Sequence, residues 1–341
     1  MRTTIKDIAS KTNLSITTVS LVLNNKGSKI SEKTKQMVLD AAEELRYRPN
    51  QLAVGLVKRH TQTIGLILPD LTNSFFAELF KAVGEGAAQS DYHVVLCSSG
   101  NHTSQELNNI DMLIDKGVDG IILATVQEST EQDIEEACRC AELNGVAMVL
   151  IDRPSNCGRV GCVSLDNASG GYMAVKHLID CGHSNIGFVT GPESFPPTQE
   201  RLGGAKRAMQ EAGIAFHEAW CFEGDYQFNG GARGAEYFYD SHVTAVFVFN
   251  DMMTFAFIRR MEELGSRIPQ DISVVGFDDV QFSELMKVST VHQPVYEMGV
   301  NAARMVIKAV EQPGEYVHKI FVPSLRIRET TKGIIHEFAE K

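Results

Sequence analysis

The spacing of hydrophobic residues changes about sixty residues into the chain. Before that point, apolar side chains recur three or four positions apart, which predicts helices at 4–11, 16–23 and 31–45. After it, short apolar runs such as IGLILP and VVLCSS alternate with amphipathic stretches. Buried strands separated by helices are typical of doubly wound parallel sheets. The pattern therefore predicts an N-terminal all-α unit and an α/β body of two such sheets.

These patterns divide the chain into three parts. We predict a helical headpiece at 1–48, a hinge helix with its linker at 49–60, and the body at 61–341. A crossover between the two sheets of the body is expected near the GCVSLD run. The predicted subdomains are, first, 61–160 with 292–322 and, second, 161–291 with 323–331.

Polar residues mark the ends of the predicted helices. Thr4, Ser15 and Ser31 each precede a helix, where a side-chain oxygen can accept a hydrogen bond from a free backbone N–H. Asn13 falls between the first two helices, and asparagine tolerates the left-handed backbone that a tight turn needs. The first two helices are therefore expected to form a helix-turn-helix.

Charge is distributed unevenly along the chain. The 341 residues carry a net charge of -11, but residues 1–60 hold eleven Lys/Arg against five Asp/Glu, a net of +6, which leaves -17 for the remainder. A basic segment on an acidic body is typical of a protein that binds a polyanion, such as a nucleic acid, with one end. The alternative is a solvated basic face without a partner. With 43% hydrophobic residues, the chain is expected to fold rather than to be disordered.

The cysteines and the N-terminal segment bear on location. Seven cysteines, an odd number without CxxC pairing, favour a reducing cytoplasm. The N-terminal MRTTIKDIASKT lacks the apolar core of a signal peptide, and no later run has the length needed to cross a bilayer. We therefore expect a cytoplasmic protein without membrane association.

Motifs for cofactors and metals are weak. The G-x-G at Gly84 and Gly86 lacks a third glycine and lies in a helical stretch, so we expect no nucleotide cofactor. His177, Cys181 and His183 leave a metal site open as an alternative. The segment HLIDCGHSNIGFV is better interpreted as a helix stopped by a glycine before a buried strand, and we expect no metal.

The first 58 residues carry a specific motif. The segment TIKDIASKTNLSITTVSLVLNN, followed by a third helix and YRPNQLAVGL, resembles the headpiece of LacI/GalR transcriptional regulators over residues 4–58. The resemblance implies that the second helix enters the major groove of operator DNA, with Ile16, Thr17 and Leu21 facing base edges. It implies further DNA contacts, mainly to phosphates or through the hinge, by Ser15, Thr18, Ser20, Asn24, Ala53 and Leu56.

The predicted hinge and one base-reading position differ from the usual family pattern. The resemblance implies that Leu56 wedges between base steps in the minor groove and kinks the duplex, with packing against the body as the alternative. Gly55 weakens the short hinge helix, which is expected to order only beside a second hinge on DNA. Leu21 stands where many members carry a long polar side chain, and it can touch a thymine methyl but cannot hydrogen-bond a base.

Polar and aromatic residues follow the predicted strands of the body. In doubly wound sheets, ligands bind beyond the carboxyl ends of the strands, and this set suits the hydroxyls and C–H faces of a polyhydroxylated ligand. DLTNSFFAEL, the FND run and VVGFDD resemble the sugar-sensing domain of the same family, which has the fold of periplasmic binding proteins. The effector-binding residues that this resemblance implies are Asn73, Phe75, Asp152, Arg201, Tyr226, Asn250 and Asp278. The alternative for each Asp or Asn is a helix N-cap.

These observations predict a transcriptional repressor that binds DNA with inverted half-sites as a homodimer and responds to a small effector, most simply a sugar. Two other classes share the body. A sugar-binding transport component would carry a signal peptide and no headpiece, and an enzyme of the doubly wound class would turn over a substrate. We expect neither.

Overall fold

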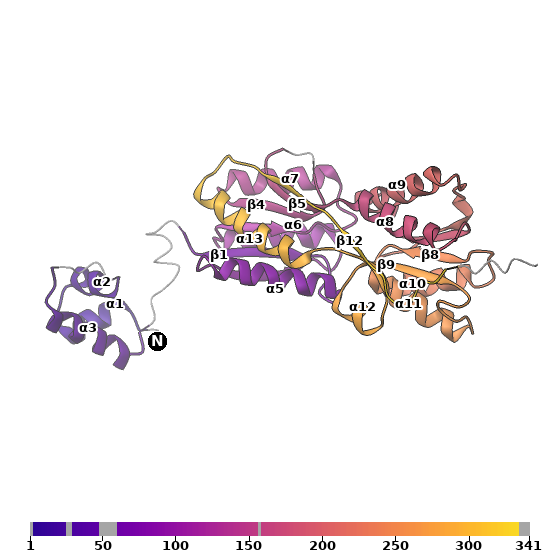
Figure 1. The fold of residues 1–341 in the computed structure, drawn as a ribbon. Coiled ribbons are helices and arrows are strands. Elements are labelled where there is room, and N and C mark those ends of the chain that lie inside the picture. Colours follow the sequence, from indigo (N-terminus) through magenta and orange to yellow (C-terminus); the bar gives the residue numbers. More distant parts are fainter. Residues whose placement is uncertain (1–2, 25–28, 48–59, 156–157, 334–341) are drawn as a thin grey trace, which may run out of the picture. The chain divides into compact units, whose positions relative to one another are not determined.

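The computed structural model describes residues 3–24, 29–47, 60–155 and 158–333 (Figure 1). These residues belong to two compact units, Met1–Gln62 and Thr63–Lys341. The hinge residues Ala53 and Leu56 lie outside the described ranges, so their predicted roles stay predictions. Within the described ranges, no helix is both long enough and apolar enough to cross a membrane.

The first unit contains the three predicted helices, α1 (Ile5–Thr12), α2 (Ile16–Leu23) and α3 (Glu32–Glu44). The predicted caps are confirmed at α2 and α3, where the hydroxyls of Ser15 and Ser31 accept hydrogen bonds from backbone N–H groups three residues later. Asn13 has the expected left-handed backbone, with φ at 54°. The small core between the helices consists of Ile8, Ala9, Val19, Val22, Val38 and Ala41.

The first sheet of the body has six strands in the order β11-β5-β4-β3-β1-β2, and every neighbouring pair is parallel. The strands are β1 (Thr63–Leu68), β2 (His93–Ser98), β3 (Gly120–Leu123), β4 (Ala147–Asp152), β5 (Gly161–Leu165) and β11 (His318–Phe321). The helices of this subdomain are α5 (Ser74–Ala88), α6 (Thr103–Asp115), α7 (Glu131–Leu143) and α13 (Val295–Glu311).

Helices α5 and α13 lie side by side although they are far apart in the sequence (Figure 1). The hydroxyl of Tyr296 on α13 donates a hydrogen bond of 2.9 Å to Glu85 on α5. The buried side chains of α6 and α7 belong to a separate apolar cluster with residues of β3 and β4. The first sheet is therefore covered on both faces, as its nearly continuous apolar strands require.

The second sheet has the order β12-β10-β9-β8-β6-β7. Its strands are β6 (Ile186–Thr190), β7 (Cys221–Glu223), β8 (Ala245–Val248), β9 (Ser273–Asp278), β10 (Ser289–His292) and β12 (Ser324–Arg326). The helices of this subdomain are α8 (Asn167–Asp180), α9 (Pro196–Glu211), the single 3-10 turn η1 (Glu218–Trp220), α10 (Phe228–Phe238), α11 (Asp251–Glu263) and α12 (Gln281–Leu285). Its strands are parallel except β12, which runs antiparallel to β10.

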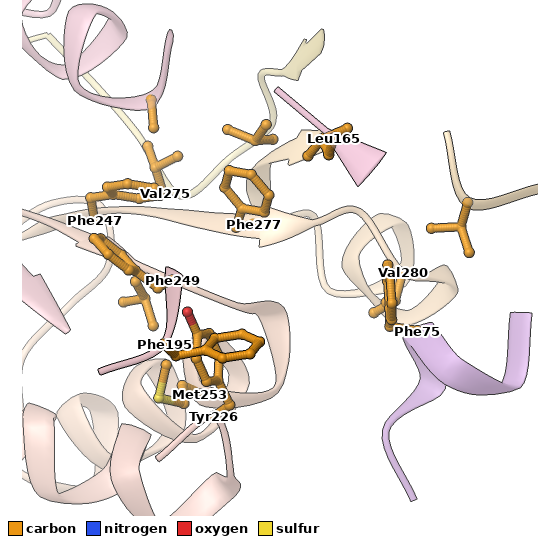
Figure 2. Close-up of a cluster of buried hydrophobic side chains, with 14 of the residues drawn as sticks. Phe75, Leu165, Phe195, Tyr226, Phe247, Phe249, Met253, Val275, Phe277 and Val280 are labelled. Atoms are coloured by element: carbon orange, nitrogen blue, oxygen red, sulfur yellow. The ribbon is translucent and has the colours of Figure 1, made fainter. Parts of the chain in front are cut away.

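Three segments connect the two subdomains, between β5 and α8, between β10 and α13, and between β11 and β12. The predicted start of the second subdomain at residue 161 is wrong, because β5 pairs in parallel with β4 and belongs to the first sheet. The crossover follows Leu165, inside the GCVSLD run. One large apolar cluster contains residues of both subdomains, among them Phe75 of α5 and Phe277 of β9 (Figure 2).

Candidate functional site

A cavity lies between the two subdomains of the body, at the carboxyl ends of their strands. It encloses about 580 Å³, part of which is open to solvent, and this is the size of a small-molecule site. All seven residues that the sequence predicted as effector contacts line it, namely Asn73, Phe75, Asp152, Arg201, Tyr226, Asn250 and Asp278. The sheets therefore bring together residues that are as much as 205 positions apart.

Nine further residues complete the lining. Asp70, Phe76 and Thr125 follow predicted strands, so the same signal pointed to them. The sequence analysis missed Pro69, Asn101, Gln127, Phe195, Gln227 and Gln293. Gln293 directly follows β10, so the rule that ligands bind past strand ends could have found it. Phe195 lies in the short loop between β6 and α9, so the same rule could have found it.

Asn73 and Asn250 are helix N-caps as well as lining residues. The side-chain oxygen of Asn73 accepts a hydrogen bond of 3.0 Å from the Phe75 N–H, and that of Asn250 accepts one of 2.9 Å from the Met253 N–H. The Asn250 amide nitrogen also donates to the carbonyl oxygen of Tyr226 at 3.0 Å. The N-cap interpretation is therefore confirmed for both residues, which also line the cavity, and Asn250 in addition holds the loop that carries Tyr226.

Arg201 is a buried cation in the wall of the cavity. Its Nε donates to the side-chain oxygen of Asn167 at 2.9 Å, and its Nη1 donates to the carbonyl oxygen of Phe249. The guanidinium lies over the ring of Phe277, with its carbon 3.7 Å from the ring centre. Hydrogen bonds and an aromatic face together hold the planar group in one orientation.

The close packing of α8 against α9 positions Arg201. A Cβ on Gly204 of α9 would lie 1.8 Å from the carbonyl oxygen of Ala168, and one on Gly171 of α8 would lie 2.0 Å from that of Arg201. Real Cβ atoms do not approach other atoms this closely. The two glycines therefore allow the helix backbones to touch at the level of Arg201.

Two carboxylates end strands from opposite subdomains, Asp152 on β4 and Asp278 on β9. Both have positive φ, 74° and 122°, which turns the chain sharply at the strand end. Asp152 is partly accessible from the cavity, yet the protein around it excludes most water, which raises its pKa to about 6 against the opposing effect of Arg201. Burial likewise raises the pKa of Asp278 well above its usual range.

Aromatic rings form another part of the wall. Tyr226 is buried, with φ at 60°, and its hydroxyl shares a hydrogen bond of 2.8 Å with Thr198. Its ring meets that of Phe195 edge to face, with 6.0 Å between centres, and the two are drawn together in Figure 2. Phe75 and Phe76 make a similar pair at 5.1 Å. The cavity thus offers flat apolar surface beside its charged groups.

Three other acidic or basic residues at strand ends do not line the cavity. Arg153 donates to the carbonyl oxygen of Ser129 at 2.7 Å and lies near Glu131. Asp251 accepts hydrogen bonds from Ser283 and from Thr290, and Asp279 pairs with Arg328 and His292. These residues hold the loops around the cavity in place.

The structure gives the histidines near residue 180 other partners. His183 has Thr244 at 3.0 Å from Nδ1 and Ser273 at 3.1 Å from Nε2, so both ring nitrogens are used within the fold. His177 has Thr331 at 3.0 Å from Nε2. Among the residues that the structure describes, no three His, Cys, Asp or Glu side chains are grouped to hold a metal ion.

Helix α2 presents a mixed surface to solvent. Ile16 and Leu21 are 46% and 38% exposed, although both are apolar, and Thr17 is also exposed. Ser15 and Thr18 share a hydrogen bond of 2.8 Å between their hydroxyls at the start of the helix. At its end, the Asn24 amide donates to the carbonyl oxygen of Ser20 at 2.8 Å. The three predicted base-reading residues are therefore all accessible on α2.

Comparison with known proteins identifies both parts of the chain. Residues 4–50 match the model of bacterial regulatory proteins of the lacI family, and residues 61–330 match that of periplasmic binding proteins and the sugar binding domain of the LacI family. The transcriptional repressor PurR of Vibrio vulnificus is 35% identical over 338 residues, which cover 97% of this chain and 99% of that protein.

Solved structures agree with this match. The complex of the transcriptional regulator CelR with cellobiose is 27% identical, covers 97% of this chain and all of that one, and has a TM-score of 0.72. The lac repressor dimer bound to operator and an anti-inducer has the same fold, with a TM-score of 0.86, 24% identity, and coverage of 98% of this chain and all of that one. The chain therefore belongs to the LacI family of DNA-binding transcriptional regulators, which join a helix-turn-helix headpiece to an effector-binding body.

Proposed function

We propose that this protein is a repressor that binds operator DNA as a homodimer and whose operator affinity is set by a sugar or sugar derivative in the cavity of the body. One observation carries the proposal: seven residues chosen from strand ends in two separate sheets line a single cavity. A two-fold dimer presents two headpieces, which require inverted half-sites in the operator.

The lining of the cavity supports a polyhydroxylated effector. Asp152 and Asp278 supply acceptors for hydroxyl groups, Arg201 supplies donors, and Tyr226 and Phe75 supply flat apolar faces. CelR, which has the same fold, is known with cellobiose bound. We assign effector binding to the seven predicted residues on these grounds.

The exposed face of α2 supports DNA recognition. Ile16 and Leu21 are apolar side chains held in solvent, where they can meet thymine methyl groups, and Thr17 lies beside them. We assign phosphate contacts to Ser15, Thr18, Ser20 and Asn24, and minor-groove contacts to Ala53 and Leu56 of the hinge. We infer a cytoplasmic location from the proposed binding to operator DNA.

Effector binding can be coupled to DNA binding through the two subdomains. A ligand that touches Asp152 of the first subdomain and Asp278 of the second favours one arrangement of the two. A change in that arrangement alters how the paired hinges meet the DNA, and the coupling must be reciprocal.

The test measures operator binding with and without sugars. DNA selected by the protein from a random library is labelled, and binding is followed by fluorescence anisotropy while candidate sugars are added. We expect a sugar that raises the melting temperature of the body to change the DNA affinity at least about 5-fold, the lower end of typical allosteric coupling.

Two variants on α9 sharpen this test. Arg201→Ala removes a lining residue and should abolish the response to the sugar, whereas Arg207→Ala changes an exposed arginine on the same helix and should preserve it. An equal response in the two variants would contradict the assigned site. The proposal also holds that the protein is not an enzyme. Turnover of any sugar in the presence of ATP or NAD would contradict this part of it.

A further inference from the structure

Two buried polar groups in the wall of the cavity have no hydrogen-bond partner among the described residues. They are the hydroxyl of Thr125, which is 5% exposed, and the side-chain oxygen of Gln293, which is 2% exposed. A buried polar atom without a partner costs stability, so folded proteins rarely retain one without a reason. Both residues line the cavity, where a bound molecule can supply what is missing.

Hydrogen-bond acceptors predominate around these two groups. Gln293 donates one N–H of its amide to Asp278, with 2.7 Å between Nε2 and Oδ1, and its side-chain oxygen has no partner among the described residues. The carboxylate of Asp152 also lines the cavity, and it accepts no hydrogen bond from another described residue. The wall therefore offers unused acceptors on Asp152 and Gln293, and these require a ligand rich in O–H or N–H donors.

Negative charge also predominates in the lining. Three carboxylates, Asp70, Asp152 and Asp278, face the cavity, and Arg201 is its only Lys or Arg among the described residues. Arg201 has already committed Nε and Nη1 to Asn167 and to the carbonyl oxygen of Phe249. A phosphate or carboxylate on the ligand would meet three carboxyl groups and a single cation, two of whose five N–H groups already donate within the protein.

We propose that the effector is a neutral or amine-bearing polyol, without phosphate or carboxylate, and that Thr125 and Gln293 are specificity-determining residues which hydrogen-bond it. The proposal rests on the proposed function, and it narrows the class of ligand. Hydroxyl or ammonium groups of the effector donate to Asp152 and to the Gln293 oxygen, and the Thr125 hydroxyl pairs with a ligand hydroxyl.

A pair of threonine variants tests the role of Thr125 without any ligand. Thr125→Val replaces an unpartnered hydroxyl by a methyl group of similar size and should raise the Tm of the full chain, by about 2 °C. Thr330 is equally buried, but its hydroxyl donates to the Val274 carbonyl at 2.7 Å and accepts from the Ser289 N–H at 2.9 Å, so Thr330→Val should lower the Tm. A fall in Tm for both variants would assign Thr125 a structural role and overturn its part of the proposal.

Matched ligands test, on the wild-type chain, the proposed exclusion of phosphate and carboxylate groups, which we call the charge rule. D-glucose, D-glucosamine, D-glucose 6-phosphate and D-gluconate form one set, D-ribose and D-ribose 5-phosphate a second, and cellobiose is added alone. Thermal shift and operator binding are measured with each. We expect every compound that raises Tm to be neutral or to carry an amine, and Thr125→Val to weaken its binding at least about 5-fold, the loss of one hydrogen bond.

The outcomes separate the two proposals. A phosphorylated or acidic member that binds more tightly than its neutral parent, and that changes operator affinity, would overturn the charge rule while the proposed function stands. Indifference of operator binding to every compound in the panel would overturn the proposed control by a sugar, and the charge rule with it.

Discussion

The guanidinium carbon of Arg201 lies 3.7 Å from the centre of the Phe277 ring, and the backbone of Arg201 packs closely against Gly171 of α8. Phe277, a hydrophobic core residue of β9, therefore helps to orient the arginine of the cavity. Lysine keeps the charge but cannot reproduce the planar stacking or the two hydrogen bonds.

Arg201→Lys should therefore destabilise the body by about 3 kcal/mol, the value of hydrogen bonds to a buried charged group, and should remove the response to effector. Urea unfolding and operator binding measure the two effects. Arg207→Lys, on the exposed side of the same helix, should change stability by less than about 0.5 kcal/mol. Similar losses in both variants would mean that the contact with Phe277 contributes little.

The contact between α8 and α9 predicts opposite effects for neighbouring glycines. Gly204→Ala places a Cβ 1.8 Å from a backbone carbonyl oxygen, which must force the helices apart, and we expect a loss of at least about 2 kcal/mol. Gly203→Ala meets nothing within 4 Å and should stabilise the helix by about 0.5 to 1 kcal/mol. Thermal unfolding of the two variants makes the comparison, and equal Tm values would be inconsistent with the close helix approach.

The pKa of Asp152 predicts how stability depends on pH. Because burial raises this pKa to about 6, the folded protein binds the proton more tightly than the unfolded chain does. Stability should therefore fall as the pH rises from about 4 to about 6, and stay low above that range. Asp152→Asn removes this loss and should be more stable than wild type at pH 7.5, by up to about 3 kcal/mol, but not at pH 4.

Urea unfolding at several pH values measures this difference. Asp240→Asn, which changes an exposed aspartate of the same body, should leave the pH dependence as in wild type. Retention of the full dependence in Asp152→Asn would show that another group causes it. Effector affinity should fall below pH 6, since a protonated Asp152 accepts hydrogen bonds more weakly.

Exposed apolar residues on α2 predict a specific effect on DNA recognition. Leu21→Ala should weaken binding to the selected operator by about 1 kcal/mol and relax the base preference at one position in each half-site. Leu39→Ala changes an apolar residue of α3 that is 47% exposed, and should leave the base preference unchanged. Selection of DNA by each variant, followed by sequencing, tests this; an unaltered preference in Leu21→Ala would exclude a base-reading role.

The hinge prediction rests on sequence alone. Leu56→Ala should lower operator affinity and reduce DNA bending, because a smaller side chain cannot wedge between base steps. Gel mobility of circularly permuted operator fragments measures the bend, and circular dichroism checks that the headpiece stays folded. Unchanged affinity with a folded headpiece would remove the wedge.

Local sequence was enough to predict the headpiece and most of the cavity. The caps at Ser15 and Ser31, and the left-handed turn at Asn13, depend on neighbours within a few residues, so the sequence determines them directly. The convergence of these residues on one cavity was also predictable, because parallel strands end at one edge of a sheet and bring together the residues that follow them.

Tertiary structure decided which of those strand-end residues face the cavity. Asp278 lines the cavity, but its neighbour Asp279 does not, because its carboxylate accepts a hydrogen bond from Arg328. Arg328 belongs to a segment about fifty residues later in the chain. Pairing with β4 likewise put β5 in the first sheet. The unpartnered oxygen of Gln293 and the ring beneath Arg201 depend on contacts between distant elements, which no local pattern encodes because they exist only once both sheets are folded and packed together.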